Sequence, residues 1–138
     1  MLINIYIDMK NRNIVIDTNI FYAVLNDKDS LHIQASKLLE KMSEHILIVP
    51  YSVISETSTL LTYRQWKKKA DDFVSSLRNT KNIFIVSNSM DDEMNLFLEV
   101  ETKISFTDIS LIAVSKKYNA ELATFDKQLL QLYKKLSK

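Results

Sequence analysis

The segment that decides the fold is N-I-V-I-D-T-N, residues 13–19. Asn13–Asp17 is a short, mainly apolar run rich in β-branched side chains, which predicts a strand buried on both faces. Thr18–Leu25 follows at once and has the pattern of a helix. A buried strand that passes directly into a helix is the typical opening of a parallel α/β unit.

The same alternation of strand and helix continues along the rest of the chain. Ser30 is a good N-cap residue for the next predicted helix, and Pro50, the only proline, stops the second predicted strand. We expect a three-layer α/β/α sandwich with a parallel sheet. The further predicted strands are 46–49, 82–86 and 121–125, and the predicted helices are 31–43, 52–63, 65–77, 91–102, 107–118 and 126–136.

Composition excludes several classes of active site. The chain has 138 residues, which suits one domain, and its formal net charge is only +1. It contains no cysteine, so disulfides, thiolate catalysis and zinc–thiolate sites are excluded. It also contains no glycine, which excludes the P-loop, the G-x-G-x-x-G turn and the G-x-S-x-G elbow.

The first residues differ in character from the rest. Residues 1–12 are expected to be an N-terminal extension or an extra edge strand, because Met9 begins a segment that would also serve as a start. The apolar run near Met1 is short and has no basic leader, so it does not resemble a signal peptide. No apolar stretch approaches membrane-spanning length. We expect a cytoplasmic protein that does not enter the membrane.

Four acidic residues are predicted to converge at one edge of the sheet. Asp17 ends the first strand, and Asp126 directly follows the fourth. The carboxyl ends of parallel strands lie at the same edge, where open α/β sheets bind ligands. Glu56 lies shortly after the second strand, and Asp108 reaches this edge if the turn I-S-F (residues 104–106) leads there.

Clustered carboxylates need a partner. In an apolar setting they repel one another and tend to take up protons, whereas a divalent cation removes the conflict. A site made only of carboxylate oxygens suits Mg²⁺ or Mn²⁺ better than zinc.

Each acid alone also has a structural interpretation. Asp17 and Asp126 are good helix N-caps, and Asp108 stabilises a first helical turn without any catalytic reason. Glu56 is harder to explain in this way, because it lies along the apolar stripe of its helix and must be paired or exposed at a cleft. The functional interpretation depends on the four acids occurring together.

The ordered set of acids resembles the PIN-domain family, and most closely its small VapC-type toxin ribonucleases from type II toxin–antitoxin systems. The motifs that carry the resemblance are V-I-D-T-N, V-I-S-E-T, S-F-T-D-I-S-L-I-A and A-T-F-D-K, which contain the four acids in the family's order. The resemblance covers roughly residues 13–136, so residues 13–138 are expected to form a PIN-like nuclease domain. The lack of glycine and the N-terminal extension depart from the pattern without touching the acids.

The resemblance implies a metal-dependent endoribonuclease that hydrolyses phosphodiester bonds with Mg²⁺ or Mn²⁺. It implies catalytic roles for all four acids, metal ligation by Asp17, Asp108 and Asp126, and supporting roles for Asn19 and Thr124. Asp17 and Asp126 are the first choices as direct ligands, while the division of roles between the other two acids stays open. The resemblance also implies an RNA substrate, a small antitoxin partner and a homodimer.

Three other interpretations stay open at this point. The chain could be an RNA-processing nuclease that is not a toxin, or a catalytically silent PIN module that binds RNA or a protein. It could also be an unrelated α/β binding protein in which the acids only cap helices. The run W-K-K-K (66–69) could contact RNA, but a solvated helix face is preferred. No histidine or serine stands in a recognisable catalytic arrangement.

Overall fold

The computed structural model describes residues 13–64, 66–87 and 90–137. The predicted N-terminal extension lies outside these ranges. Within them the elements alternate as expected, and every predicted strand and helix has a counterpart. Their bounds are β1 Asn13–Ile16, α1 Thr18–Leu25, α2 His32–Lys41, β2 Ile46–Pro50, α3 Tyr51–Tyr63, α4 Lys67–Asn79, β3 Ile83–Val86, α5 Met90–Glu99, α6 Phe106–Lys117, β4 Glu121–Ala123 and α7 Lys127–Leu136.

The four described strands form one parallel sheet in the order β3-β2-β1-β4. β1 lies inside the sheet, and its residues Ile14, Val15 and Ile16 are completely buried. Such burial is the physical reason why the strand reads as a continuous apolar run. The parallel pairing places the carboxyl ends of β1 and β4 side by side, because Val15 is paired with Leu122 and Ile16 with Ala123.

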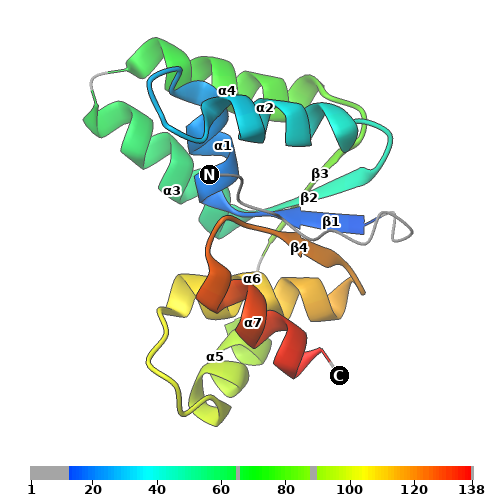
Figure 1. The fold of residues 1–138 in the computed structure, drawn as a ribbon. Coiled ribbons are helices and arrows are strands. Elements are labelled where there is room, and N and C mark those ends of the chain that lie inside the picture. Colours follow the sequence, from blue (N-terminus) through cyan, green and yellow to red (C-terminus); the bar gives the residue numbers. More distant parts are fainter. Residues whose placement is uncertain (1–12, 65, 88–89, 138) are drawn as a thin grey trace.

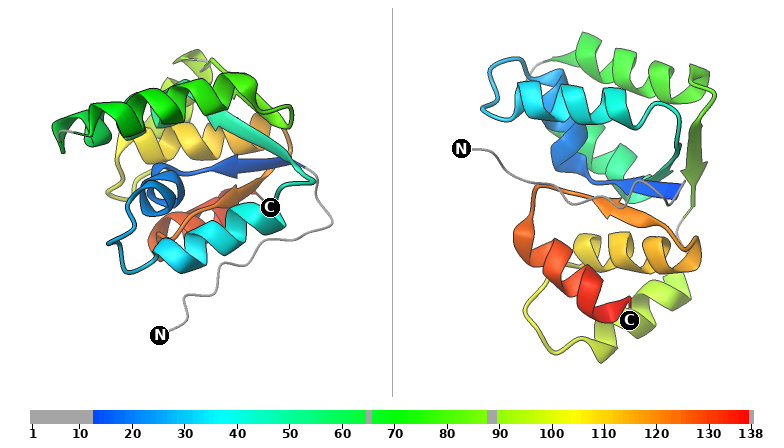
Figure 2. Two further views of the ribbon diagram at one scale, coloured as in Figure 1. Left: turned by 90° about the horizontal axis from the view of Figure 1, so that it is seen from above. Right: turned by 45° about the vertical axis from the view of Figure 1, so that its right-hand side comes forward.

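Helices cover both faces of this sheet and complete the predicted three-layer sandwich. Helices α1 to α4 lie on one side, and α5 to α7 lie on the other (Figure 1). The two further views show the same division (Figure 2). The chain after β1 therefore turns to one face, while the chain after the neighbouring β4 turns to the opposite face. A point where neighbouring strands send their helices to opposite faces opens a crevice at the carboxyl edge.

The main differences from the predicted elements lie at helix ends. The helix predicted over 91–102 ends at Glu99, and the predicted N-cap at Ser30 is wrong. The helix begins at His32 after Leu31, which makes no side-chain cap. The side chain of Asp29 accepts the Leu31 backbone N–H at 2.8 Å, so an Asp-based turn replaces the serine cap.

No helix within the described ranges is both long and apolar enough to cross a bilayer.

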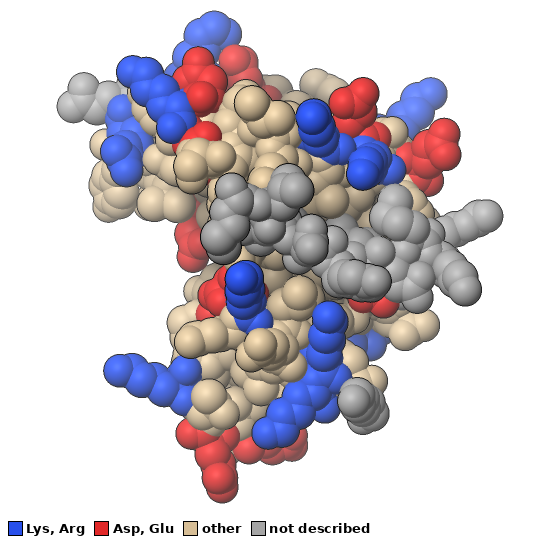
Figure 3. Space-filling model, viewed as in Figure 1, with Lys and Arg blue, Asp and Glu red and all other residues tan. Residues whose placement is uncertain are grey.

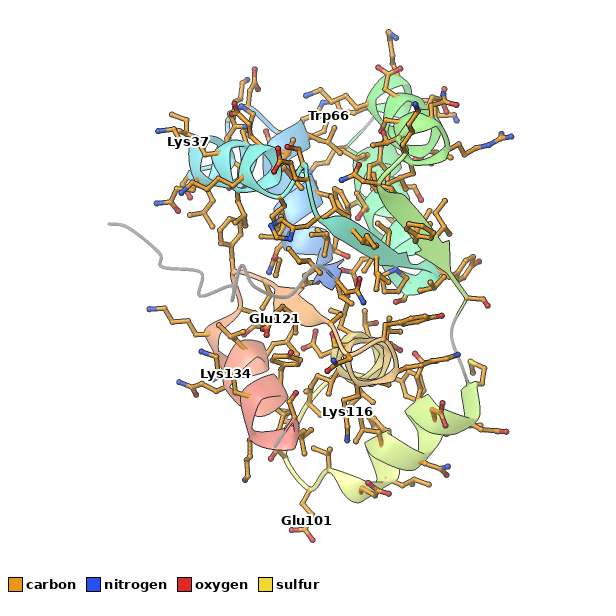
Figure 4. The ribbon with its side chains drawn as sticks, turned by 90° about the vertical axis from the view of Figure 1, so that its right-hand side faces the viewer. Lys37, Trp66, Glu101, Lys116, Glu121 and Lys134 are labelled. Carbon is orange, nitrogen blue, oxygen red and sulfur yellow. The ribbon has the colours of Figure 1, made fainter. Side chains whose placement is uncertain are left out.

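The segment W-K-K-K has a packing role in this fold. Trp66 is half-buried and stacks on Tyr22, with 6.5 Å between ring centroids. The Lys69 ammonium lies 4.5 Å from the Trp66 ring centroid and donates to the Leu25 carbonyl at 2.9 Å, close to the end of α1. Trp66 lies among the helices of the first layer, away from the lower part of the molecule (Figure 4). Lys67 and Lys68 are exposed, so the preferred interpretation as a solvated helix face is confirmed for them, whereas the contacts of Trp66 and Lys69 with α1 were not predicted.

Candidate functional site

The site begins at Asp17, which ends β1 and caps α1. Its carboxylate accepts the Thr18 backbone N–H at 2.7 Å and the Thr124 hydroxyl at 2.7 Å. Its own N–H donates to the Ala123 carbonyl at 3.0 Å, which continues the β1–β4 ladder by one bond. The side chain is 6% exposed. The fold therefore holds a carboxylate nearly buried at the crevice between β1 and β4.

The Thr124 hydroxyl is the junction of a small polar network. It donates to Asp17 and accepts the Asp126 backbone N–H at 3.0 Å and the Asn19 side-chain amide at 3.3 Å. The Asn19 carbonyl oxygen in turn accepts the Phe125 N–H at 3.3 Å. β4 ends at Ala123, and the next two residues, Thr124 and Phe125, bond to Asp17 and Asn19 at the start of α1 instead of to a strand. This network fixes the position of the Asp17 carboxylate.

Asp126 is the N-cap of α7. One of its carboxylate oxygens, Oδ1, accepts the N–H groups of Gln128 at 3.0 Å and Leu129 at 3.1 Å. Within the described chain the other oxygen, Oδ2, accepts no hydrogen bond, and the residue is exposed. The helix-cap interpretation is therefore right for Asp126, but it uses only half of the carboxylate and leaves Oδ2 directed to solvent or a ligand.

Asp108 and Glu56 complete the acidic group from two other helices. Asp108 lies in the first turn of α6, and its N–H donates to Ser105, the N-cap, at 3.1 Å. Glu56 lies on α3 and is exposed. Of the two possibilities for an acid on the apolar stripe, paired or exposed, the structure shows the exposed one. Figure 1 shows α6 and α7 beginning on the same side of the molecule as the carboxyl ends of β1 and β4.

The electrostatics show that the structure brings the four acids together. Burial, as the main cause, raises the pKa of Asp17 from 3.8 to about 6, and the charges of Asp108 and Glu56 add to this rise. Hydrogen bonds from Thr124 and Thr18 oppose it. Burial also raises the pKa of Asp108, with further contributions from Asp126 and Glu56. The acids lie close enough to repel one another, which argues against independent helix caps.

None of these four acids has an ion-pair partner within the described chain. The ion pairs found there join Lys67 to Asp71 and Lys68 to Asp72, all on α4. The repulsion among the acids is therefore not relieved by a lysine or arginine. A bound cation is the usual alternative.

The donor set fits a hydrated magnesium-type ion better than a closed metal cage. No three acids or histidines among residues 13–64, 66–87 and 90–137 are grouped so that they could all hold one ion. Mg²⁺ usually keeps several waters and is held by only one or two carboxylates, whereas a structural zinc site needs four protein ligands. Pairs of these acids with water between them are therefore compatible with Mg²⁺ or Mn²⁺.

A groove extends from this acidic group. It has a volume of about 920 Å³ and is lined by Asp108 and Asp126 together with the 102–105 segment and one face of α7. Lys103, in the segment that leads to α6, also lines it. Lys116 and Lys117 line a separate hollow against α5. Lys135 lines the groove as well and was not predicted from the sequence. Its place three residues after Leu132 puts both side chains on one face of the helix.

Comparison with known proteins agrees with this geometry. The family model described as PIN domain matches residues 14–135. Among solved structures, the chain is similar to VapC20 of Mycobacterium tuberculosis, described as a toxin that cleaves the sarcin-ricin loop, with a TM-score of 0.74 and 24% identity. The match covers 86% of this chain and 94% of that one. A search of curated proteins found no match.

Proposed function

Because the chain belongs to the PIN-domain family, we propose that it is a metal-dependent endoribonuclease and the toxin of a type II toxin–antitoxin pair. The observation that carries the proposal is the meeting of Asp17, Glu56, Asp108 and Asp126 at one edge of the sheet without a basic partner in the described chain. Structural acids are normally paired with cations or separated from one another.

In this proposal Asp17, Asp108 and Asp126 hold Mg²⁺ or Mn²⁺, directly or through water. The chemistry that such a cation supplies is activation of a water and stabilisation of charge on the phosphate during hydrolysis of a P–O bond. Thr124 and Asn19 keep the Asp17 carboxylate in place through their hydrogen bonds. The second oxygen of Asp126 accepts no hydrogen bond in the described chain and is available to the cation, and the exposed Glu56 orients the attacking water or takes its proton.

The toxin part of the proposal is supported by the fold shared with VapC20. A toxin of this kind acts on cytoplasmic RNA and needs an antitoxin partner to hold it in check. We infer a homodimer as well, because an apolar hollow of about 570 Å³ lies beside Glu56 and exposes large apolar side chains that a partner would cover. The exposed apolar residues in its lining are Tyr51, Leu60, Tyr63, Met90 and Phe106.

The test is a titration of Mn²⁺ and Mg²⁺ into the protein by calorimetry, with cleavage of a structured RNA followed in the same samples. We expect metal binding and cleavage in the wild type and the loss of both in Asp17→Asn and Asp108→Asn. Asp91→Asn is the matched control, because Asp91 is an exposed aspartate on α5 outside the acidic group. It should behave as the wild type.

The alternative outcomes are distinct. Metal binding without cleavage of any RNA would favour a catalytically silent module that binds RNA or a protein. Cleavage confined to one precursor RNA, without toxicity on expression, would favour an RNA-processing nuclease. No metal binding by the wild type would overturn the proposal.

A further inference from the structure

The acidic site has two open flanks that differ in charge. The hollow on the α3 side, beside Glu56, is lined by no lysine or arginine among the described residues. The groove on the α7 side, which has Asp108 and Asp126 at its acidic end, also has Lys103 and Lys135 in its lining. A phosphate chain that approaches four carboxylates is repelled unless cations lie along its path. The flank along α7 offers such cations.

The two lysines of this α7 groove are available for a ligand. Both are exposed, and neither takes part in the ion pairs of the described chain, which use Lys67 and Lys68. Lys69, by contrast, is occupied by the Leu25 carbonyl. Basic side chains gather over α7 on the lower front of the molecule (Figure 3). Lys103 and Lys135 line the same groove as Asp108 and Asp126, so their charges lie where a strand leaving the acidic site along α7 would pass.

The floor of the α7 groove suits the rest of a nucleotide. Gln128, Gln131 and Lys135 recur at intervals of three and four residues, so they lie along one face of α7. Leu129 is buried and Leu132 is half-buried on the same side, which gives the groove an apolar floor. Amide side chains above an apolar floor can contact a sugar or the edge of an unpaired base.

We propose that the α7 groove binds the single-stranded RNA segment next to the scissile phosphate, with Lys103 and Lys135 contacting its phosphates. This inference rests on the proposed function for the identity of the substrate. It adds that the RNA leaves the acidic site over α7 and not over α3. Both lysines act as positioning residues, because they hold the strand without touching the bond that is cut.

The test measures the salt dependence of RNA binding. Binding of a fluorescent single-stranded oligouridylate is followed by anisotropy between about 50 and 200 mM NaCl, with Ca²⁺ in place of Mg²⁺. Each of Lys103→Gln and Lys135→Gln should lower the slope of log K against log [salt] by about 0.7, the value for one phosphate contact on a single strand. An oligoadenylate should show the same losses, because a phosphate contact carries no base information.

Lys134→Gln is the matched control. Lys134 is the neighbour of Lys135 on α7, does not line the groove, and has an interaction elsewhere in the protein. Figure 4 shows it on the part of α7 that lies below Glu121 of β4. Its substitution should leave the slope unchanged. Lys103→Arg and Lys135→Arg should retain the wild-type slope, because the positive charge is kept.

The outcomes separate this inference from the proposed nuclease activity. Equal slopes in the wild type and in all three glutamine variants, or no binding by the wild type, would overturn the proposal that RNA binds in the α7 groove. This holds even if the protein cuts RNA with Mg²⁺. The expected loss of slope in Lys103→Gln and Lys135→Gln supports the groove. If this loss occurs while the wild type cuts no RNA with Mg²⁺ or Mn²⁺, the nuclease proposal fails, but RNA binding in the α7 groove is supported.

Discussion

At the scale of single residues, the ionised carboxylate of Asp17 destabilises the fold. It is nearly buried, its charge is repelled by Asp108 and Glu56, and it is held in place by Thr124. Its position could be predicted from the sequence, because it follows a buried strand and precedes a helix. The family resemblance implied only a supporting role for Thr124. Its bond to Asp17 was not predicted, since hydrogen bonds between residues 107 positions apart leave no local pattern.

Asp17 should make the stability of the metal-free protein depend on pH. Its pKa is about 6 in the fold against a reference of 3.8, so the fold favours the protonated form. Its contribution is fully present below the unfolded pKa and is lost as pH rises to about 6, after which the ionised form costs about 3 kcal/mol. Asp17→Asn removes this charge but loses one hydrogen bond, because the amide nitrogen cannot accept the Thr124 hydroxyl. The net effect should be a rise of roughly 1–2 kcal/mol in the free energy of unfolding at pH 8.

Urea unfolding in EDTA across this pH range measures the effect. The stability advantage of Asp17→Asn over the wild type, measured as the free energy of unfolding, should shrink as pH falls from about 6 to about 4. Asp91→Asn, exposed on α5, should follow the wild type. An advantage that is the same at every pH would contradict the assigned cause.

Thr124 should couple stability to metal binding. Thr124→Val keeps the shape but removes the hydroxyl that Asp17, Asn19 and Asp126 share. We expect a loss of about 1–3 kcal/mol in the free energy of unfolding and roughly 10–100-fold weaker metal binding, because the charged oxygen of Asp17 loses its donor. Thr124→Ser should restore both. Denaturant melts and calorimetry check this, and equal behaviour of the valine and serine variants would show that the hydroxyl is dispensable.

At the scale of elements, the apolar runs and helix periods predicted every strand and helix of the described chain. The helix ends were harder to predict, because several side chains near an end can compete for the same backbone N–H groups. Asp29 accepts the Leu31 N–H and the helix begins at His32, and β4 stops at Ala123, after which the Thr124 side chain bonds to Asp17. The direction of α6 was also open, since nothing in I-S-F shows which way the chain turns.

The cap role of Asp126 on α7 can be separated from its proposed metal role. Asp126→Asn keeps a good N-cap, while Asp126→Ala removes it. The alanine variant should lose about 1 kcal/mol of stability, because Gln128 and Leu129 lose their acceptor, and the asparagine variant should lose much less. Both should lose cleavage if the charge binds the metal. Thermal melts and an RNA cleavage assay test this, and an active asparagine variant would leave Asp126 as a cap only.

At the scale of the whole molecule, the sandwich places helices on both faces of the sheet (Figure 2). The alternating pattern predicted this layering. The strand order was not predicted, because it depends on which edge the last strand joins. That choice places β4 beside β1, so that Thr124 can bond to both Asp17 and the N–H of Asp126.

The inferred homodimer is tested at this scale. Tyr63 is 81% exposed at the apolar hollow beside Glu56, and we expect Tyr63→Lys to convert a dimer into a monomer in light scattering. Ile33→Lys is the control, because Ile33 is 67% exposed on α2 and does not line the hollow. A monomeric wild type would refute the dimer, and dissociation by both variants would refute this choice of surface.

The bond between Thr124 and Asp17 also ties the site to the order of synthesis. The two partners are 107 positions apart, and β4 is the last strand of the described sheet. A ribosome has therefore translated almost the whole domain before Asp17 meets its partner, and a fragment that stops before Thr124 carries only part of the acidic group. The complete acidic group therefore exists only after nearly all of the domain has been synthesised.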